Sequence, residues 1–316
     1  MNNNFHLDFE RPIVELEKKI AELSQQADTG GLEIDQEIVR LNERVEEQRQ
    51  KIYSNLSSWQ KVQISRHPNR PYALDYVERM LSDFRELHGD RYYGDDPSVV
   101  GGPARLDGDS IMVVGIQSGR NLDERQRRNF GMPHPEGYRK ALRLMKMAAK
   151  FNMPILTMVD TSGAYPGVEA EERGQAEAIA QSMKVALNCE APCISIVIGE
   201  GGSGGAIALA TSDRVLMLSN SIYSVISPEG CSSILWKSSD YAEMASNSLK
   251  ITAKDCLDLK IIDEIIEEPI GGAHRNHEII CRDLKKSLLD NLNDLKKIDL
   301  ASLRTKRNNR YLNYLP

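Results

Sequence analysis

Two glycine-rich stretches contain the residues best suited to chemistry. Residues 160–167 read DTSGAYPG and residues 199–206 read GEGGSGGA, and they follow apolar runs at 154–159 and 193–198. A helix-like stretch follows each of them. A buried strand that turns through glycines into a helix N-terminus exposes backbone N–H groups, and glycine lets a ligand approach those groups closely. The pattern indicates a site that stabilises anions through the main chain, without a catalytic side chain.

The second stretch also has the spacing of a dinucleotide-binding turn. Gly199, Gly201 and Gly204 form a GxGxxG pattern after an apolar run. A dinucleotide site needs an acidic residue about twenty positions further on, after the next strand. Here the expected strand at 214–218 is followed by Ser219, so the ribose-binding carboxylate is missing. We do not favour this interpretation.

A serine hydrolase is the main alternative. Gly201, Ser203 and Gly205 form the GxSxG pattern of a nucleophile elbow, in the strand–turn–helix context that such an elbow requires. The enzyme would also need an acid and then a histidine downstream. His274 and His277 are the only histidines after Ser203.

Several carboxylates flank the two stretches, and a pair of them could supply acid–base catalysis to an acyl thioester. Glu171 and Glu172 fall in the first turn of an expected helix, where acidic residues stabilise the helix dipole. Asp160 stands where a turn or capping residue is expected. Glu200 lies inside the second stretch, and we expect a structural role for it.

Composition and charge argue against several classes of function. The chain has 316 residues and a net charge of −6, which gives no support to nucleic-acid or anionic-membrane binding. Its five cysteines form no CxxC pair and no zinc spacing, so we expect reduced thiols, no metal site and a cytoplasmic protein. The N-terminus lacks the features of a secretory signal, and no apolar stretch reaches membrane-spanning length.

The elements around the two stretches alternate as in an α/β fold. Residues 10–60 predict a helical hairpin broken at 28–31, either packed on the protein itself or serving as a partner-binding arm, and residues 71–89 predict a further helix. Strands are expected at 111–117, 154–159, 193–198, 214–218 and 222–226, and helices at 137–150, 171–188, 204–211, 252–259 and 276–294. Residues 305–316 are expected to be loose. Ligands of such folds bind at the carboxyl ends of parallel strands, where both glycine-rich stretches fall.

Longer motifs are similar to those of one known family. They are RNFGMP at 128–133, PEGYRKA at 135–141, DTSGAYPG at 160–167, EERGQ at 171–175, GEGGSGGA at 199–206, YSVISPEGC at 223–231 and GGAHR at 271–275. Together with ELHGDR at 86–91, they resemble the carboxyltransferase α subunits of bacterial acetyl-CoA carboxylases over nearly the whole chain. One departure is Ser162, where the family usually has proline.

The resemblance implies a crotonase-like α/β fold, a superhelix of strand–strand–helix units with an N-terminal helical extension. The helical region would cover residues 1–95 and the carboxyltransferase domain residues 96–316. The implied reaction transfers a carboxyl group from carboxybiotin to acetyl-CoA and forms malonyl-CoA for fatty acid synthesis. Both substrates develop oxyanions, which backbone N–H groups can stabilise.

The resemblance also implies which residues form the site. It gives the catalytic role, donation of backbone N–H groups to the oxyanion, to Gly204, Gly205 and Ala206. The carboxybiotin side of the site is assigned to Gly163, Ala164, Gly201 and Gly202. Ser203 is then a turn residue, and the chain holds no metal.

The implied partners are a zinc-bearing carboxyltransferase β subunit, the biotin carboxyl carrier protein that holds the biotin, and biotin carboxylase, with the α and β subunits forming an α2β2 heterotetramer. Neither a membrane nor a nucleic acid is expected as a partner. Three hypotheses follow: a transferase half-site that needs a partner, a self-contained serine hydrolase with Ser203 as nucleophile, and an assembly subunit whose turns merely pack.

Overall fold

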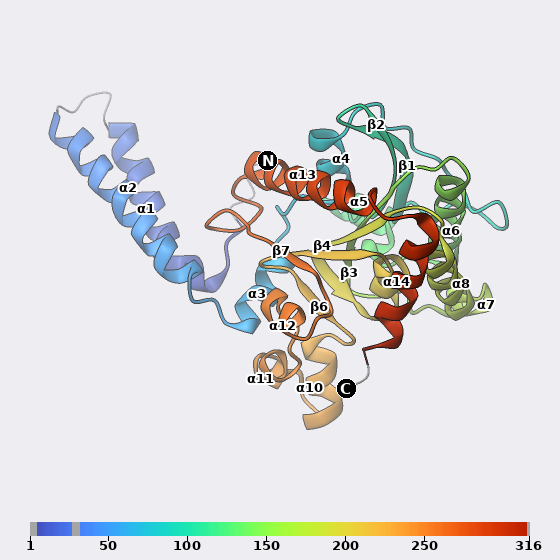
Figure 1. The fold of residues 1–316 in the computed structure, drawn as a ribbon. Helices are drawn as coiled ribbons and strands as arrows, with labels where there is room; N and C mark the ends of the chain where they lie inside the picture. The colour runs from blue at the N-terminus through green and yellow to red at the C-terminus, as the bar shows by residue number, and fades with distance from the viewer. Residues whose placement is uncertain (1–4, 27–31, 315–316) are drawn as a thin grey trace.

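The computed structural model describes residues 5–26 and 32–314, and its core is one mixed β-sheet (Figure 1). Its seven strands follow the order β1-β2-β3-β4-β5-β7, with β6 paired to the end of β4. β1 and β2 are antiparallel and the other pairs are parallel. The strands are β1 (Val99–Leu106), β2 (Asp109–Ile116), β3 (Ile155–Thr161), β4 (Cys193–Gly202), β5 (Arg214–Leu218), β6 (Ile222–Ser224) and β7 (Glu264–Ile266). The expected α/β fold class is confirmed.

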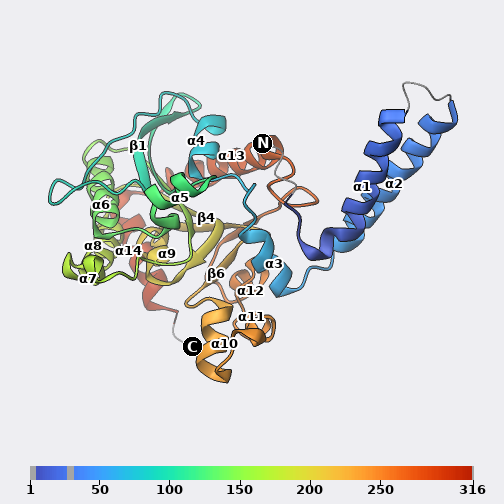
Figure 2. The same ribbon diagram turned by 180° about the vertical axis from the view of Figure 1, so that it is seen from behind.

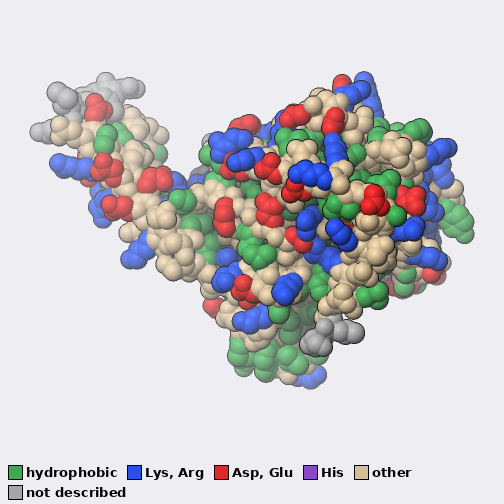
Figure 3. Space-filling view, in the orientation of Figure 1, with side chains coloured by type: hydrophobic (Ala, Val, Ile, Leu, Met, Phe, Trp, Pro, Cys, Tyr) green, Lys and Arg blue, Asp and Glu red, His purple; other side chains and the backbone are tan. Residues whose placement is uncertain are grey.

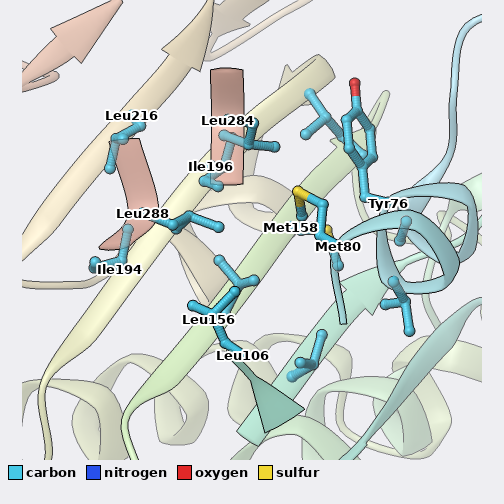
Figure 4. Close-up of a cluster of buried hydrophobic side chains, with 14 of the residues drawn as sticks. Tyr76, Met80, Leu106, Leu156, Met158, Ile194, Ile196, Leu216, Leu284 and Leu288 are labelled. Carbon is cyan, nitrogen blue, oxygen red and sulfur yellow. The ribbon is translucent and has the colours of Figure 1, made fainter. Parts of the chain in front are cut away.

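Helices cover both faces of the sheet, and β3 and β4 are therefore buried along nearly their whole length. On one face, α4 and α13 bury Tyr76 and Leu284 against the strands (Figure 4). On the other face, α6, α8 and α9 contribute side chains such as Leu144 and Leu209. These helices are α4 (Ala73–Met80), α6 (Pro135–Lys150), α8 (Gln175–Asn188), α9 (Ser203–Ala210) and α13 (His277–Leu295). Helix α4, from the expected N-terminal helical region, packs into this core. The domain division expected between residues 95 and 96 stays a prediction.

The N-terminal helices project from the body of the sheet as a hairpin, as Figures 1 and 2 show from opposite sides. The predicted helical hairpin is confirmed by α1 (Arg11–Gln26) and α2 (Leu32–Tyr53), and its expected turn at 28–31 lies outside the described residues. At the base of the hairpin, the Tyr53 hydroxyl donates to Glu10 Oε1 over 2.8 Å, and Arg275 Nη2 lies 3.4 Å from the same oxygen. These contacts fix the base of the hairpin to the body.

Shorter helices connect and cover the remaining strands. They are α3 (Ser58–Ser65), α5 (Leu122–Arg127), α7 (Val168–Glu172), α10 (Pro228–Trp236), α11 (Ala242–Ser248), α12 (Ala253–Asp258) and the 3-10 turns η1 (Asp8–Glu10), η3 (Asn129–Gly131) and η4 (Ser239–Tyr241). None of the helices in the described part of the chain is both long and apolar enough to cross a membrane.

The helix predicted at 71–89 was too long, because α4 ends at Met80. The chain then runs extended along β1, and the backbone N–H groups of Arg85 and Leu87 donate to carbonyls of that strand over 3.0 and 2.8 Å. A Cβ atom on Gly102 would lie 1.9 Å from the carbonyl oxygen of Arg85. The glycine therefore permits the close crossing, and its own strand β1 was missed because glycine and proline interrupt its apolar pattern.

The C-terminal segment is ordered and not loose, since Leu300–Leu312 forms α14. Arg307 of this helix is almost fully buried. Its guanidinium contacts both carboxylate oxygens of Asp213, over 2.8 and 2.6 Å, and donates to the carbonyls of Ala186 and Ala191. The Arg307 guanidinium thus satisfies several buried backbone carbonyls. These hydrogen bonds explain why the polar C-terminal segment packs against the body of the protein.

Replacing Arg307 with alanine should strongly destabilise the chain, because Asp213 and several carbonyls would be left buried without partners. We expect a loss of about 3–5 kcal/mol in the free energy of unfolding, measured by urea denaturation. Arg304→Ala, in the same helix, removes only an exposed pair with Glu190 and serves as the control. Equal losses in the two variants would contradict the role given to Arg307.

Candidate functional site

The two glycine-rich stretches meet at the carboxyl end of the sheet. β3 and β4 are parallel neighbours, and Thr161 at the end of β3 is paired with Gly201 near the end of β4. The register shifts between Val159 and Thr161, so the last residues of β3 leave the regular ladder. The first turn follows β3, and the second turn leads directly from β4 into α9.

The main chains of the two turns are in direct contact. A Cβ atom on Gly202 would lie 2.2 Å from the carbonyl oxygen of Ser162. One on Gly205 would lie 2.7 Å from the carbonyl carbon of Gly163 and 2.8 Å from the nitrogen of Ala164. Real Cβ atoms do not approach backbone atoms so closely, so glycine at these two positions is what allows the turns to form one surface.

The outer side of the first turn is open. Gly163 has a φ of +154°, and a Cβ atom there would have no neighbour within 4 Å. The Thr161 hydroxyl fixes this residue from below, because it donates to the Gly163 carbonyl over 2.7 Å and accepts from the Gly163 N–H over 3.0 Å. Ser162 is exposed and Ala164 is half-buried.

The second turn places a short helix N-terminus beside this opening. Ser203, the first residue of α9, has a φ of +51° and is exposed, whereas Gly205 and Ala206 are buried. The first N–H groups of a helix have no acceptor within the helix, so those of Gly204 and Gly205 are candidates for a ligand. The Ala206 N–H is the first that the helix geometry pairs internally, with the carbonyl of Gly202.

Comparison with known proteins identifies the family. A family profile described as "Acetyl co-enzyme A carboxylase carboxyltransferase-like" matches residues 6–315. The acetyl-coenzyme A carboxylase carboxyl transferase subunit alpha of Vibrio parahaemolyticus is 53% identical over 317 residues, covering 99% of both chains. The subunit of the same name from Geobacter metallireducens is 53% identical over 305 residues, covering 96% of this chain and 95% of the relative.

The chain belongs to the acetyl-CoA carboxylase carboxyltransferase α-subunit family. It is accordingly an enzyme component, the carboxyltransferase part of a biotin-dependent carboxylase that includes other subunits. The resemblance seen in the sequence motifs is confirmed.

Solved structures confirm the crotonase-like fold. The transcarboxylase 12S structure with methylmalonyl-coenzyme A bound aligns with a TM-score of 0.57 at 18% identity, over 71% of this chain and 41% of that chain. A Pseudomonas malonate decarboxylase hetero-tetramer in complex with coenzyme A aligns with a TM-score of 0.58 at 15% identity, over 70% of this chain and 87% of that chain. At these identities the likeness concerns the fold alone.

Within this family member, the histidines required by the hydrolase alternative are engaged elsewhere. The His274 ring stacks on His67 with centroids 3.8 Å apart, and both of its nitrogens are buried without hydrogen-bond partners. Burial and the neighbouring His67 lower the pKa of His274 to about 2. His277 Nε2 lies 3.1 Å from the Asn69 carbonyl oxygen. No contact in the described residues joins Ser203 to either histidine, so the serine–histidine pair that the hydrolase alternative requires does not form there.

Asp160 ties the ends of the two strands together. Its Oδ1 accepts from the backbone N–H of Glu200 over 2.9 Å. Burial raises the pKa of Asp160 to about 6, and the hydrogen bond from Glu200 and the charge of Arg70 oppose that shift. The expected role of Asp160 as a turn residue is consistent with this contact.

Arg66 contacts the second glycine-rich stretch, and the sequence did not indicate this contact. Its guanidinium makes two bonds to the Glu200 carboxylate, over 3.0 and 2.8 Å, and its Nη1 lies 2.6 Å from Glu229 Oε1. Arg66 caps α3, Glu200 lies near the end of β4 inside the second glycine-rich stretch, and Glu229 is in the first turn of α10. One side chain therefore joins the end of β4 to a helix on each side.

The described residues contain no group of three or more His, Cys, Asp or Glu side chains arranged to hold a metal ion. The carboxylates near the turns are instead used as hydrogen-bond acceptors within the protein, as Asp160 and Glu200 illustrate.

Replacing Arg66 with alanine should slow carboxyl transfer by about ten- to a hundredfold, because a small displacement of the second turn misaligns the reacting groups. We expect little loss of stability, about 1 kcal/mol or less, since the arginine is partly exposed. Arg66→Lys should not restore the rate, because an ammonium group cannot bind two carboxylates as a planar fork. Rates are measured in the assembled carboxylase, together with melting temperatures.

Arg79→Ala is the matched control, since Arg79 forms a similarly exposed pair with Glu278 over 3.2 Å, remote from the turns. If Arg66→Ala and Arg79→Ala transfer carboxyl groups at the same rate, Arg66 does not position the site.

Proposed function

We propose that the two contacting turns form the carboxybiotin-facing wall of the carboxyl-transfer site. The observation that carries this proposal is the contact of Gly205 with the main chain of Gly163 and Ala164, which joins both turns into one surface. The surface is open on the side of Gly163 and Ser203, so a substrate can reach it.

In this proposal the chain acts through its main chain. The N–C bond of the carboxybiotin substrate breaks, the acetyl-CoA methyl carbon loses a proton to the ureido nitrogen, and a new C–C bond forms. Negative charge develops on the ureido oxygen and on the enolate oxygen during transfer. Fixed N–H groups in a cleft that excludes water stabilise such oxyanions without reorganising.

The roles of the individual residues follow from their positions. Gly204 and Gly205 supply N–H groups from the first turn of α9. Gly163 and Ala164 shape the neighbouring surface, and Gly201 and Gly202 hold the second turn against the first. Ala206, which the family resemblance places among the donors, is buried and its N–H belongs to the helix. We give it a packing role.

A partner subunit must complete this site. Beside the turns, β6 pairs with the end of β4, and the segment that follows exposes a set of apolar side chains over α10 and α11 (Figure 3). The members of this α10–α11 patch are Val225, Ile234, Leu235, Trp236, Tyr241 and Met244. A contiguous exposed apolar surface next to a site is typical of a subunit interface.

We propose that a zinc-bearing β subunit docks on the α10–α11 patch and contributes the acetyl-CoA side. The biotin carboxyl carrier protein would then deliver biotin that biotin carboxylase has charged, and two copies of each carboxyltransferase subunit would form an α2β2 heterotetramer in the cytoplasm. Continuity of the patch with the second turn supports this arrangement, because Ser224 of β6 is paired with Gly202.

The isolated chain should be nearly inactive, because one wall of the cleft is missing. Carboxyl transfer between biotin and malonyl-CoA is measured for the chain alone, for the β subunit alone and for the mixture, and only the mixture should be active. A charge within the α10–α11 patch, Leu235→Glu, should weaken assembly without unfolding the chain, since Leu235 is 62% exposed. Full turnover by the single chain would contradict the half-site.

The neighbouring glycines of the second turn test the main-chain assignment. Gly205→Ala places a Cβ atom 2.7 Å from the Gly163 backbone, so it should separate the turns, lower the unfolding free energy by about 1–3 kcal/mol and slow transfer by about a hundredfold or more.

Gly204→Ala is the matched variant, because its Cβ atom would meet only Ile179 at an ordinary 3.6 Å. Alanine in a helix is more favourable than glycine by up to about 1 kcal/mol, so this variant should be at least as stable as the parent. If its Cβ fills the ligand face, transfer slows while the melting temperature holds. If both variants transferred carboxyl groups at the rate of the parent protein, the glycine turns would have no part in the reaction.

A further inference from the structure

A rigid loop outside the catalytic turns presents arginine and tyrosine side chains to solvent. Asp90, whose side chain is 1% exposed, accepts the backbone N–H groups of Tyr92 and Tyr93 over 2.8 Å each, and the Arg139 Nε donates to its other oxygen over 2.7 Å. Arg91 itself has a φ of +68°, in the left-handed region. The loop is therefore held in a strained conformation by a buried carboxylate.

Two guanidinium groups converge on this loop without a carboxylate between them. Arg91 Nη1 and Arg143 Nη2 both donate to the carbonyl oxygen of His88, over 2.7 and 3.3 Å. Burial and the charge of Arg91 lower the pKa of Arg143. Like charges held this close are unfavourable unless an anion lies between them.

The nearby carboxylates of Asp95 and Asp90 oppose the lowering of the Arg143 pKa, but each of them is engaged by another partner. Asp90 is engaged by Arg139 and backbone N–H groups, and Asp95 by Lys140 over 2.6 Å. Among the described residues, Arg91, Arg143 and Lys146 form no ion pair with an acidic side chain. Lys146 follows Arg143 by three residues on α6, and it is exposed on the same side of the helix.

Small-molecule pockets typically have volumes of about 300–1,000 Å³. The groove between this loop, α6 and α8 has a volume of about 630 Å³, within that range. Its lining includes Arg91, Tyr92, Arg143 and Lys146. The remaining acidic group in the lining, Glu177, accepts a hydrogen bond from Gln181 over 2.7 Å. The groove therefore offers unpaired positive charge on a scaffold of two packed helices.

Tyr92 adds a surface for a planar ring. The Arg139 guanidinium lies 5.2 Å from the centre of the Tyr92 ring, and the side chain is 85% exposed, so one face of the ring remains available. Aromatic rings of this kind stack nucleic bases at sites where cations hold the phosphates.

We propose that this groove binds a nucleoside diphosphate, with the phosphates at Arg91, Arg143 and Lys146 and the base on the free face of Tyr92. The site lies on the outer side of α6 and α8, and the proposal does not depend on the roles given to the glycine turns. The same chemistry could come from a free nucleotide or from the nucleotide part of coenzyme A.

Titration calorimetry on the full chain at low salt tests the proposal with ADP, inorganic pyrophosphate, adenosine and coenzyme A. ADP should bind more tightly than pyrophosphate, and adenosine should bind least. Affinity should fall as salt is added, because the cations are partly exposed. Tighter binding of coenzyme A than of ADP would identify coenzyme A as the source of the nucleotide, and the reverse order would identify a free nucleotide.

Lys146→Glu should weaken ADP and pyrophosphate binding by about tenfold, and Lys150→Glu, one turn further along the exposed side of α6, should leave both unchanged. Tyr92→Ala should weaken ADP binding while pyrophosphate binding holds. Both lysines are exposed, so neither variant should unfold the chain, and melting temperatures confirm this. Equal ADP affinity in the two lysine variants, or no saturable heat with ADP or pyrophosphate, would overturn the proposal.

Discussion

Direct contact between the main chains of residues 162–164 and 202–205 is the constraint on which the rest of the site depends. Two parallel strands place their following turns side by side, but side chains normally keep such turns apart. Gly202 and Gly205 remove the Cβ atoms that would stand 2.2 and 2.7 Å from the first turn. The surface that results is built from backbone groups, whose positions are set by the sheet and not by rotamers.

The sheet holds this contact from beneath. The hydroxyls of Thr157 on β3 and Ser195 on β4 are 2.7 Å apart, and both lie within hydrogen-bond distance of the Leu209 carbonyl in α9, at 2.7 and 2.9 Å. The last turn of α9 is thereby tied to both strands. Because α9 is only eight residues long, fixing its far end also fixes the N-terminus that borders the first turn. Arg66 restrains the same strand end from outside through Glu200.

Local sequence patterns predicted the elements that position the site. The apolar runs before each glycine stretch became β3 and β4, and the helix-like stretch after the second became α9. Contacts distant in sequence could not be predicted in this way. Arg66 and Glu200 are separated by 134 positions, and nothing around Arg66 marks its partner. Residues 82–87 have helical spacing, but pairing with β1 overrides that local preference.

The C-terminal helix α14 is a second case in which local sequence patterns failed to predict the structure. The polar composition of residues 305–316 predicted a loose segment, yet Arg307 binds Asp213 and three carbonyl oxygens in the body of the protein. The favourable term is a set of charge-assisted hydrogen bonds to groups that would otherwise be buried without partners. Such a segment becomes ordered because the folded body of the protein offers buried acceptors for its side chains. These acceptors are brought together only when the chain folds, so the local sequence does not reveal them.

A site built from backbone also explains how the first turn can hold Ser162 where the family resemblance leads us to expect proline. At position 162 the atom that meets Gly202 is the carbonyl oxygen, which serine and proline both possess. The Ser162 side chain is exposed, so the change does not alter the packing between the turns. It restores a backbone N–H and releases the restriction on φ that proline imposes. Gly163, held by the Thr161 hydroxyl on both its N–H and its carbonyl, then carries the restraint that proline would otherwise supply.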